Sequence, residues 1–122
     1  MGERKPKDIE KRTFGFALEV VYLCRKLEER PGIGRLLSKQ LLRSGTSIGA
    51  NIQEAQAGQS RSDFVSKCAI ALKEARETIY WIRLLHESDI CSDGQLDKLQ
   101  REAEELAKII GSIIVNTKAK GF

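Results

Sequence analysis

The stretch Leu37-SKQLLRSGTSIGANIQE-Ala55 decides the fold. Its apolar residues recur at steps of three and four, which is the spacing that places side chains on one face of an α-helix. These residues are Leu37, Leu41, Ile48, Ile52 and Ala55. The stretch therefore predicts a long helix with a continuous apolar face.

Four polar residues follow the same spacing along one edge of this face: Arg43, Ser47, Asn51 and Glu54. Polar groups beside an apolar seam are costly to bury unless they bond to one another or to a partner. We expect them, with Glu77 of a neighbouring helix, to form a polar network that fixes helix register. Contact with a ligand or a nucleic acid is the alternative.

The same stretch contains Gly45 and Gly49, four residues apart, and a tryptophan, Trp81, follows further along the chain. The glycines indicate a close approach of two helices rather than a phosphate loop, because no lysine and hydroxyl pair completes a nucleotide-binding motif. We interpret Trp81 as a core or interface anchor, with base stacking as the alternative.

Working outward, four amphipathic segments follow one another between short stops. Pro31-Gly32 ends the first and Gly58 ends the second, while Ser60 with Asp63 resembles a capping box at the start of the third. Ser92 opens the fourth. The expected helices cover residues 8–30, 33–57, 60–87 and 92–117. Short connections favour antiparallel neighbours, so we predict an all-α, up-down-up-down four-helix bundle.

Residues 1–122 are expected to form one domain, since the chain is long enough for a single core and shows no internal repeat. No apolar run approaches the roughly 20 residues of a membrane span. The charged N-terminus lacks the apolar part of a secretory signal, so we expect a cytoplasmic protein. The three cysteines, Cys24, Cys68 and Cys91, show no metal or redox spacing.

The first segment is more hydrophobic than one core requires. Its apolar side chains spread over roughly 220° of the helix, whereas a surface helix needs a stripe of about 100°. They are Phe14, Phe16, Ala17, Leu18, Val20, Val21, Leu23, Cys24 and Leu27. In the third segment, Ile70, Trp81 and Leu85 lie to one side of the main seam. We expect this excess to mediate self-association, with deeper burial inside one bundle as the alternative.

Two blocks in this order, Gln40 to Ala55 and Ser60 to Leu85, resemble the signature of the four-helix-bundle proteins encoded in intervening sequences of bacterial large-subunit rRNA genes. The resemblance implies a left-handed bundle that assembles into a ring-like homopentamer. It also implies kinship with the accessory protein of diversity-generating retroelements, whose basic pentamer binds nucleic acid. It implies no enzymatic activity. The chain departs from the pattern at Ala55, where many members have glycine, and at Gly58, where arginine is common.

Charge is distributed unevenly along the chain. Residues 33–73 carry +4, from 6 basic and 2 acidic residues, and residues 74–110 carry −4, from 5 basic and 9 acidic residues. The basic block predicts a phosphate-binding face that a ring would multiply. Its members are Arg35, Lys39, Arg43, Arg61, Lys67 and Lys73. Alternatively, the basic block of one subunit meets the acidic block of the next.

Catalysis has little support in the sequence. The only histidine is His86, no metal-ligand spacing appears, and Glu102, Glu104 and Glu105 are expected on the solvated exterior of the last helix. We therefore predict no cofactor and no enzymatic activity. The leading hypothesis is a self-assembling bundle that binds RNA or DNA, or a protein that handles them. A structural or protein-interaction module is second, and an enzyme with a small molecule near Glu54 and Glu77 is third.

Overall fold

The computed structural model describes residues 6–91 and 94–121, with side chains from residue 8 onward. The described residues form four helices and no strand, which confirms the predicted all-helical class. The helices are α1 (Pro6–Glu28), α2 (Ile33–Gln56), α3 (Arg61–Glu87) and α4 (Gly94–Ala119). Within the described residues, no helix is long and apolar enough to cross a membrane.

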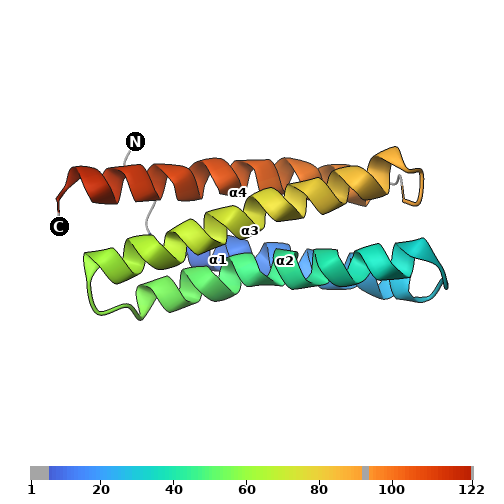
Figure 1. Cartoon of the computed structure of the whole chain (residues 1–122), viewed down its shortest axis with the longest axis horizontal. Helices are drawn as coiled ribbons and strands as arrows, with labels where there is room; N and C mark the ends of the chain where they lie inside the picture. The colour runs from blue at the N-terminus through green and yellow to red at the C-terminus, as the bar shows by residue number, and fades with distance from the viewer. Residues whose placement is uncertain (1–5, 92–93, 122) are drawn as a thin grey trace.

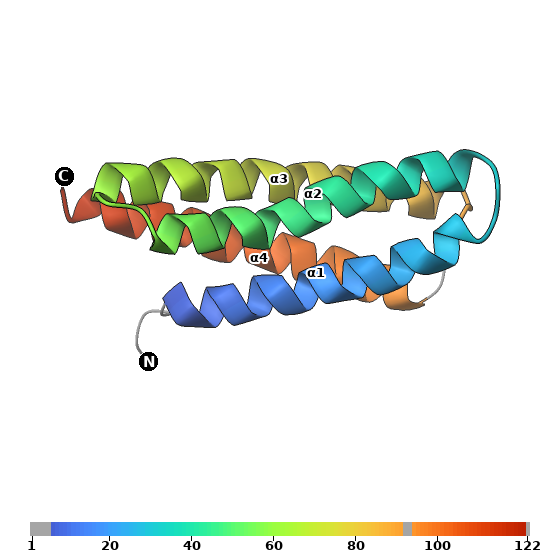
Figure 2. The same ribbon diagram turned by 90° about the horizontal axis from the view of Figure 1, so that it is seen from below.

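Each helix packs against two others, in the order α1, α2, α3, α4 and back to α1, so that α1 and α3 lie on one diagonal and α2 and α4 on the other. Figure 1 shows α2 and α3 in front of α1, with α4 along the upper edge. Figure 2 shows that α1 and α3 begin at the end of the bundle where α4 finishes, and that both run in the same direction.

Local chemistry fixes the helix ends. Gly32, which follows Pro31, has a φ of 126°, a backbone conformation that residues other than glycine rarely adopt. This turn separates α1 from α2. At the start of α3 the Asp63 amide donates to the Ser60 hydroxyl at 3.0 Å, and the Gln59 amide donates to the Asp63 carboxylate at 3.3 Å. This arrangement confirms the predicted capping-box-like start. The predicted cap Ser92 lies outside the described residues.

Among the described residues, the core contains the buried hydroxyl residues Thr13, Ser38, Ser44 and Thr78. The Thr78 and Ser44 hydroxyls are hydrogen-bonded at 2.9 Å and join α3 to α2, while the Cys24 thiol donates to the Ser38 carbonyl at 3.4 Å and joins α1 to α2. A slip of either pair of helices would break these interhelical hydrogen bonds, so they favour the observed register of the core.

Gly45 and Gly49 of α2 mark a close approach of α1. A Cβ atom at Gly45 would stand 2.9 Å from the Val20 Cγ2 atom, and one at Gly49 would stand 3.2 Å from the Thr13 hydroxyl. Both contacts are tighter than ordinary van der Waals packing. The predicted packing role of Gly45 and Gly49 is therefore confirmed.

The apolar excess of α1 is only partly absorbed by the core. Phe16, Val20, Leu23 and Cys24 are buried, but Phe14 remains 63% exposed. On α3, the prediction that Leu85 faces another side was wrong, because Leu85 is fully buried. It lies three residues after the buried Ile82 and extends the same seam.

Cys24 and Cys68 are buried in this core. Burial raises the pKa of the Cys24 thiol to about 12 and that of Cys68 to about 11. Both are protonated at neutral pH and behave as small apolar residues, since the thiolate is the reactive form.

Candidate functional site

The polar residues of α2 meet α3 around Arg43. The Arg43 guanidinium donates to Glu74 at 3.1 Å and also to Glu77, whose Oε2 atom accepts from the Trp81 indole at 3.0 Å. Glu74, Glu77 and Trp81 share a face of α3 because they are spaced by three and four residues. Arg43, Glu74, Glu77 and Trp81 are called the Arg43 cluster below.

Hydrogen bonds from Trp81 and then from Arg43 lower the pKa of Glu77, and the hydrogen bond to Glu77 raises the pKa of Arg43. Both groups are charged at neutral pH. Tyr80 packs edge-on against Trp81, with ring centroids 5.2 Å apart, and is itself 55% exposed. The cluster thus places paired charges beside exposed aromatic surface.

The structure brings Arg43 and Glu77 of the predicted network together and places Glu54 apart from them. Ser47 and Asn51 bond within α2, the first to the Arg43 carbonyl at 2.6 Å and the second to the Ser47 carbonyl at 2.8 Å. Glu54 is exposed, three turns from Arg43, and does not pair with it. Glu74 was missed by the sequence analysis, although its spacing of three from Glu77 could have indicated it.

The structure does not gather the six predicted phosphate-binding residues on one face. The Arg35 guanidinium donates to the Glu28 carbonyl at 2.7 and 3.1 Å and so closes the end of α1. Arg61 donates to the Lys120 carbonyl at 3.1 Å and to the Gly121 carbonyl, closing the end of α4. The two arginines stand at opposite ends of α2, whose 24 residues span about 36 Å.

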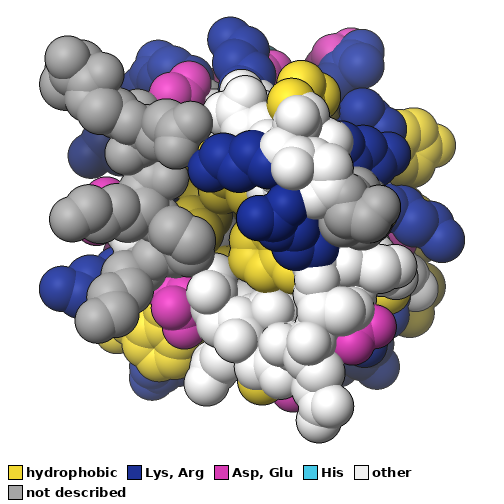
Figure 3. All heavy atoms as spheres, turned by 90° about the vertical axis from the view of Figure 1, so that its left-hand side faces the viewer, with side chains coloured by type: hydrophobic (Ala, Val, Ile, Leu, Met, Phe, Trp, Pro, Cys, Tyr) yellow, Lys and Arg dark blue, Asp and Glu magenta, His cyan; other side chains and the backbone are white. Residues whose placement is uncertain are grey.

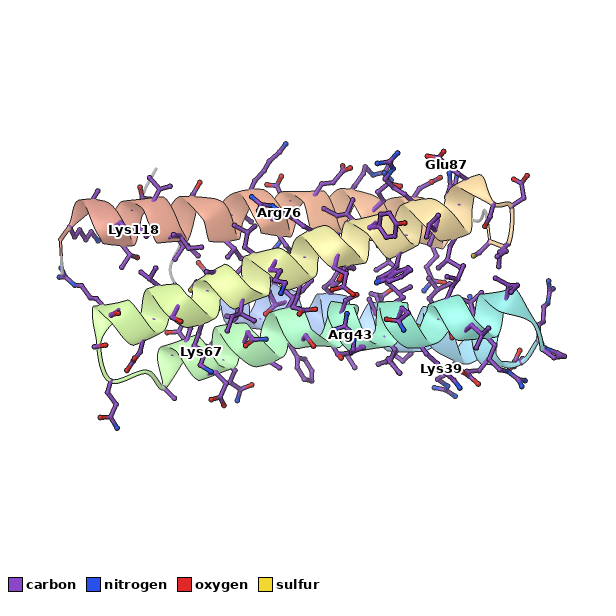
Figure 4. All side chains as sticks on the ribbon, in the orientation of Figure 1. Lys39, Arg43, Lys67, Arg76, Glu87 and Lys118 are labelled. Carbon is purple, nitrogen blue, oxygen red and sulfur yellow. The ribbon has the colours of Figure 1, made fainter. Side chains whose placement is uncertain are left out.

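Of the remaining predicted members, Arg43 is paired with carboxylates, which leaves Lys39, Lys67 and Lys73. In the described part of the chain none of these three lysines forms an ion pair within 4.0 Å. Figure 4 shows Lys39, Arg43 and Lys67 at separate points along the bundle. Figure 3 shows Lys and Arg side chains at one end with Asp and Glu side chains between them.

Charged residues on α4 are also more structural than predicted. Glu102 was expected on the exterior, but it is half-buried. Its carboxylate accepts hydrogen bonds from the Nε and Nη2 atoms of Arg12, at 2.7 and 2.9 Å. This pair ties α1 to α4, and the Glu102 hydrogen bond raises the pKa of Arg12. Glu104 is exposed as predicted.

Side chains suited to catalysis do not converge within the described ranges. His86 lies 3.8 Å from Asp97, and both are about half exposed. No group of three or more His, Cys, Asp or Glu residues among those described could hold a metal ion.

An apolar groove runs between α1 and α2, whereas the apolar excess in the sequence predicted an exposed surface on α1 alone. It has a volume of about 340 Å³, and its lining includes Phe14, Ala17 and Leu18 of α1 with Gly49 and Ala50 of α2. Phe14, Leu18 and Tyr22, the last of these 46% exposed, form a stripe along α1 at steps of four residues. This stripe is called the α1 stripe below.

Comparison with known proteins places this bundle in a family. The model of the 23S rRNA-intervening sequence protein family matches residues 6–112, which include all of α1, α2 and α3. The chain belongs to this family.

A solved structure has the same fold as this chain. A protein of unknown function from the S23 ribosomal protein family of Bacteroides thetaiotaomicron has 42% sequence identity and a TM-score of 0.80. The alignment covers 87% of this chain and 97% of that protein. No functionally curated protein matches the chain.

Proposed function

We propose that this family member is a non-enzymatic, self-assembling subunit of the cytoplasm. The observation that carries the proposal is the α1 stripe, in which Phe14, Leu18 and Tyr22 are exposed at 63%, 39% and 46%. Contiguous exposed apolar side chains beside a groove are typical of an interface, and burying them would contribute about 25 cal/mol per Å².

The proposed assembly is a homopentamer of left-handed, up-down-up-down bundles, as the resemblance of Gln40 to Ala55 implies. A ring requires two different contact surfaces on each subunit. The α1 stripe, with its groove against α2, supplies one, and the exposed side chain of Ile70, on the side of α3 that meets α2, supplies the other.

Light scattering coupled to size exclusion tests the assembly at micromolar concentration. The wild type is expected at five times the subunit mass of 13.7 kDa, and Leu18→Asp is expected at lower mass with an unchanged helical circular dichroism spectrum. Val115→Asp is the matched control, since Val115 is 65% exposed on α4, away from the stripe. A monomeric wild type, or equal masses for Leu18→Asp and Val115→Asp, contradicts the proposal.

Binding of RNA or DNA by the assembly is the second candidate. It is favoured by Lys39, Lys67 and Lys73, which form no ion pair with any residue that the structure describes and which a ring would multiply. Such binding should be weakly sequence-selective and should fall steeply with salt. A titration of short RNA and DNA at low and near-physiological salt tests it, with Lys39→Glu and Lys67→Glu. Absence of binding at low salt favours a protein-interaction module alone.

A further inference from the structure

Two apolar faces of the bundle share α2. The first is the α1–α2 face, which holds the groove between Phe14 and Ala50. The second is the α2–α3 face, where Ile70 is 39% exposed and lies on the same side of α3 as the Arg43 cluster. The described residues of α4, by contrast, expose one large apolar side chain, Val115.

The angle between two contact faces determines whether copies form a line or a ring. Neighbouring faces of a four-helix bundle meet at about 90°, whereas faces centred on the diagonal helices α1 and α3 would point about 180° apart and build a filament. In a closed ring of five copies, the directions from one copy to its two neighbours make an angle of about 108°, so its two contact faces must be inclined by about this angle. Faces that share α2 therefore suit a small closed ring.

Two core contacts show which residues of α1 and α3 stand at the same level. Val20 lies against Gly45, and the adjacent Ser44 is bonded to Thr78, so Val20 and Thr78 are level. Because α1 and α3 run in the same direction, residues at equal offsets from this pair are also level (Figure 2). Rotation about an axis parallel to the helices preserves these levels between copies.

Residues of opposite charge on the two faces lie at the same height along the bundle. Ten positions before Val20 and Thr78, Glu10 stands level with Cys68 and hence within one residue of Lys67. Glu10 lines the α1–α2 groove, and neither it nor Lys67 has an ion-pair partner within 4.0 Å among the described side chains. Phe14 is likewise level with the residues between Ile70 and Lys73. When the two faces of neighbouring copies meet, the Glu10 carboxylate is placed near the Lys67 ammonium group of the other copy. The Phe14 ring is placed near Ile70 and Lys73 of that copy.

We propose that the α1–α2 face of one copy docks on the α2–α3 face of a second copy, so that α2 lies nearest the ring axis and α4 lies on the outer rim. This placement rests on the proposed self-assembly. It also covers the Arg43 cluster, in which Arg43 already bridges both carboxylates within the subunit, and Lys73, whose charge also lowers the pKa of Glu77, lies on the same face to offset the remaining negative charge.

Distances between spin labels test the placement. Lys39 on α2 and Arg101 on α4 are both exposed cations, and each is changed to Cys in a Cys91→Ser background, in which Cys24 and Cys68 are buried. In a ring of five, neighbouring labels are about 1.2 radii apart. With helices 8–10 Å apart, the diagonal from α2 to α4 is about 13 Å, so neighbour distances should be roughly 15 Å longer for the α4 label.

The outcomes separate the placement from the assembly. Light scattering of both labelled proteins should give the mass of the wild-type assembly. An intact assembly in which the α4 labels are as close as the α2 labels, or closer, overturns the placement alone. A monomeric wild type overturns the assembly and the placement together.

A charge exchange tests the predicted contact. Glu10→Lys should weaken assembly about two- to fivefold, the range expected for one exposed ion pair, and adding Lys67→Glu should restore it. Glu10→Lys combined with Lys108→Glu on α4 is the matched control and should not restore it. Equal assembly by both double variants overturns the pairing of these faces.

Discussion

At the scale of single residues, Arg43 illustrates how a charged side chain on a helix edge becomes part of the structure. Its guanidinium is half exposed, yet it bridges two carboxylates of α3, one of which also accepts from the Trp81 indole. Each exposed ion pair contributes little by itself, but the two bonds from Arg43, with Glu77 held in place by Trp81, together fix the position of α2 along α3.

The lowered pKa of Glu77 predicts an acid-dependent loss of stability. A carboxylate whose pKa is lower in the folded state stabilises the fold above its unfolded pKa of about 4.3, and this stabilisation is lost as the pH falls through the folded pKa. Glu77→Gln should therefore reduce stability at pH 7 and flatten the decline below about pH 5. Urea unfolding at several pH values measures this. Parallel pH profiles of wild type and Glu77→Gln would contradict it.

Asn51 and Glu54 should differ in their effects on stability, although they share an edge of the helix. The half-buried Asn51 amide donates to the Ser47 carbonyl, so Asn51→Ala should cost about 1 kcal/mol. Glu54 is exposed and does not pair with Arg43, so Glu54→Ala should stay within about 0.5 kcal/mol. Thermal melts of the two variants decide between this expectation and the network expected from sequence. An equal, large loss in both would restore that network.

At the scale of helices, two glycines show the difference between the effect of a residue on helix propensity and its effect on helix packing. Gly15 and Gly45 both lie inside helices, but a Cβ atom would meet nothing within 4 Å at Gly15 and would meet Val20 at 2.9 Å at Gly45. The free-energy cost of glycine in a helix therefore has a structural reason only at Gly45.

Alanine substitutions should reveal this difference with opposite signs. Gly15→Ala is expected to raise the free energy of unfolding by about 0.5–1 kcal/mol, because alanine is the better helix former. Gly45→Ala should lower it by about 1–3 kcal/mol, because the added methyl group must push α1 away from α2. Chemical denaturation measures both, and a gain in stability at Gly45 would contradict the packing argument.

The helices themselves were predictable, because their apolar spacing, Ser60 and Pro31-Gly32 act locally. The contacts of Arg35 and Arg61 were not, since Arg35 bonds to a carbonyl at the end of α1 across a loop, and Arg61 bonds to carbonyls just after α4, half the chain away. Similarly, the spacing of Glu54 predicted its place on the α2 edge but not whether a carboxylate there would meet Arg43. The α1–α2 groove depends on the rotation of two helices about their axes, which short-range spacing does not determine.

At the scale of the whole molecule, association through the α1 stripe should couple stability to concentration. If the folded subunit binds copies of itself and the unfolded chain does not, the melting temperature rises with protein concentration. Scanning calorimetry over a hundredfold range of concentration should show this for the wild type and for Val115→Asp. Phe14→Asp should give a melting temperature that is lower and nearly independent of concentration. A concentration-independent wild type would indicate that the stripe stays uncovered.

The first turn of α1 and the last turn of α4 lie at the same end of the bundle, and these two helices are in contact (Figure 2). The end of α4 can therefore be joined to the start of α1, and the chain can be opened at another connection. A glycine-serine linker from α4 to α1, with new chain ends opened at the exposed residues 57–60, would give a circular permutant with the same core. Domains fused before α1 or after α4 would all emerge from one side of an assembled ring, and those fused to the permutant would emerge from the same side, between α2 and α3 (Figure 2).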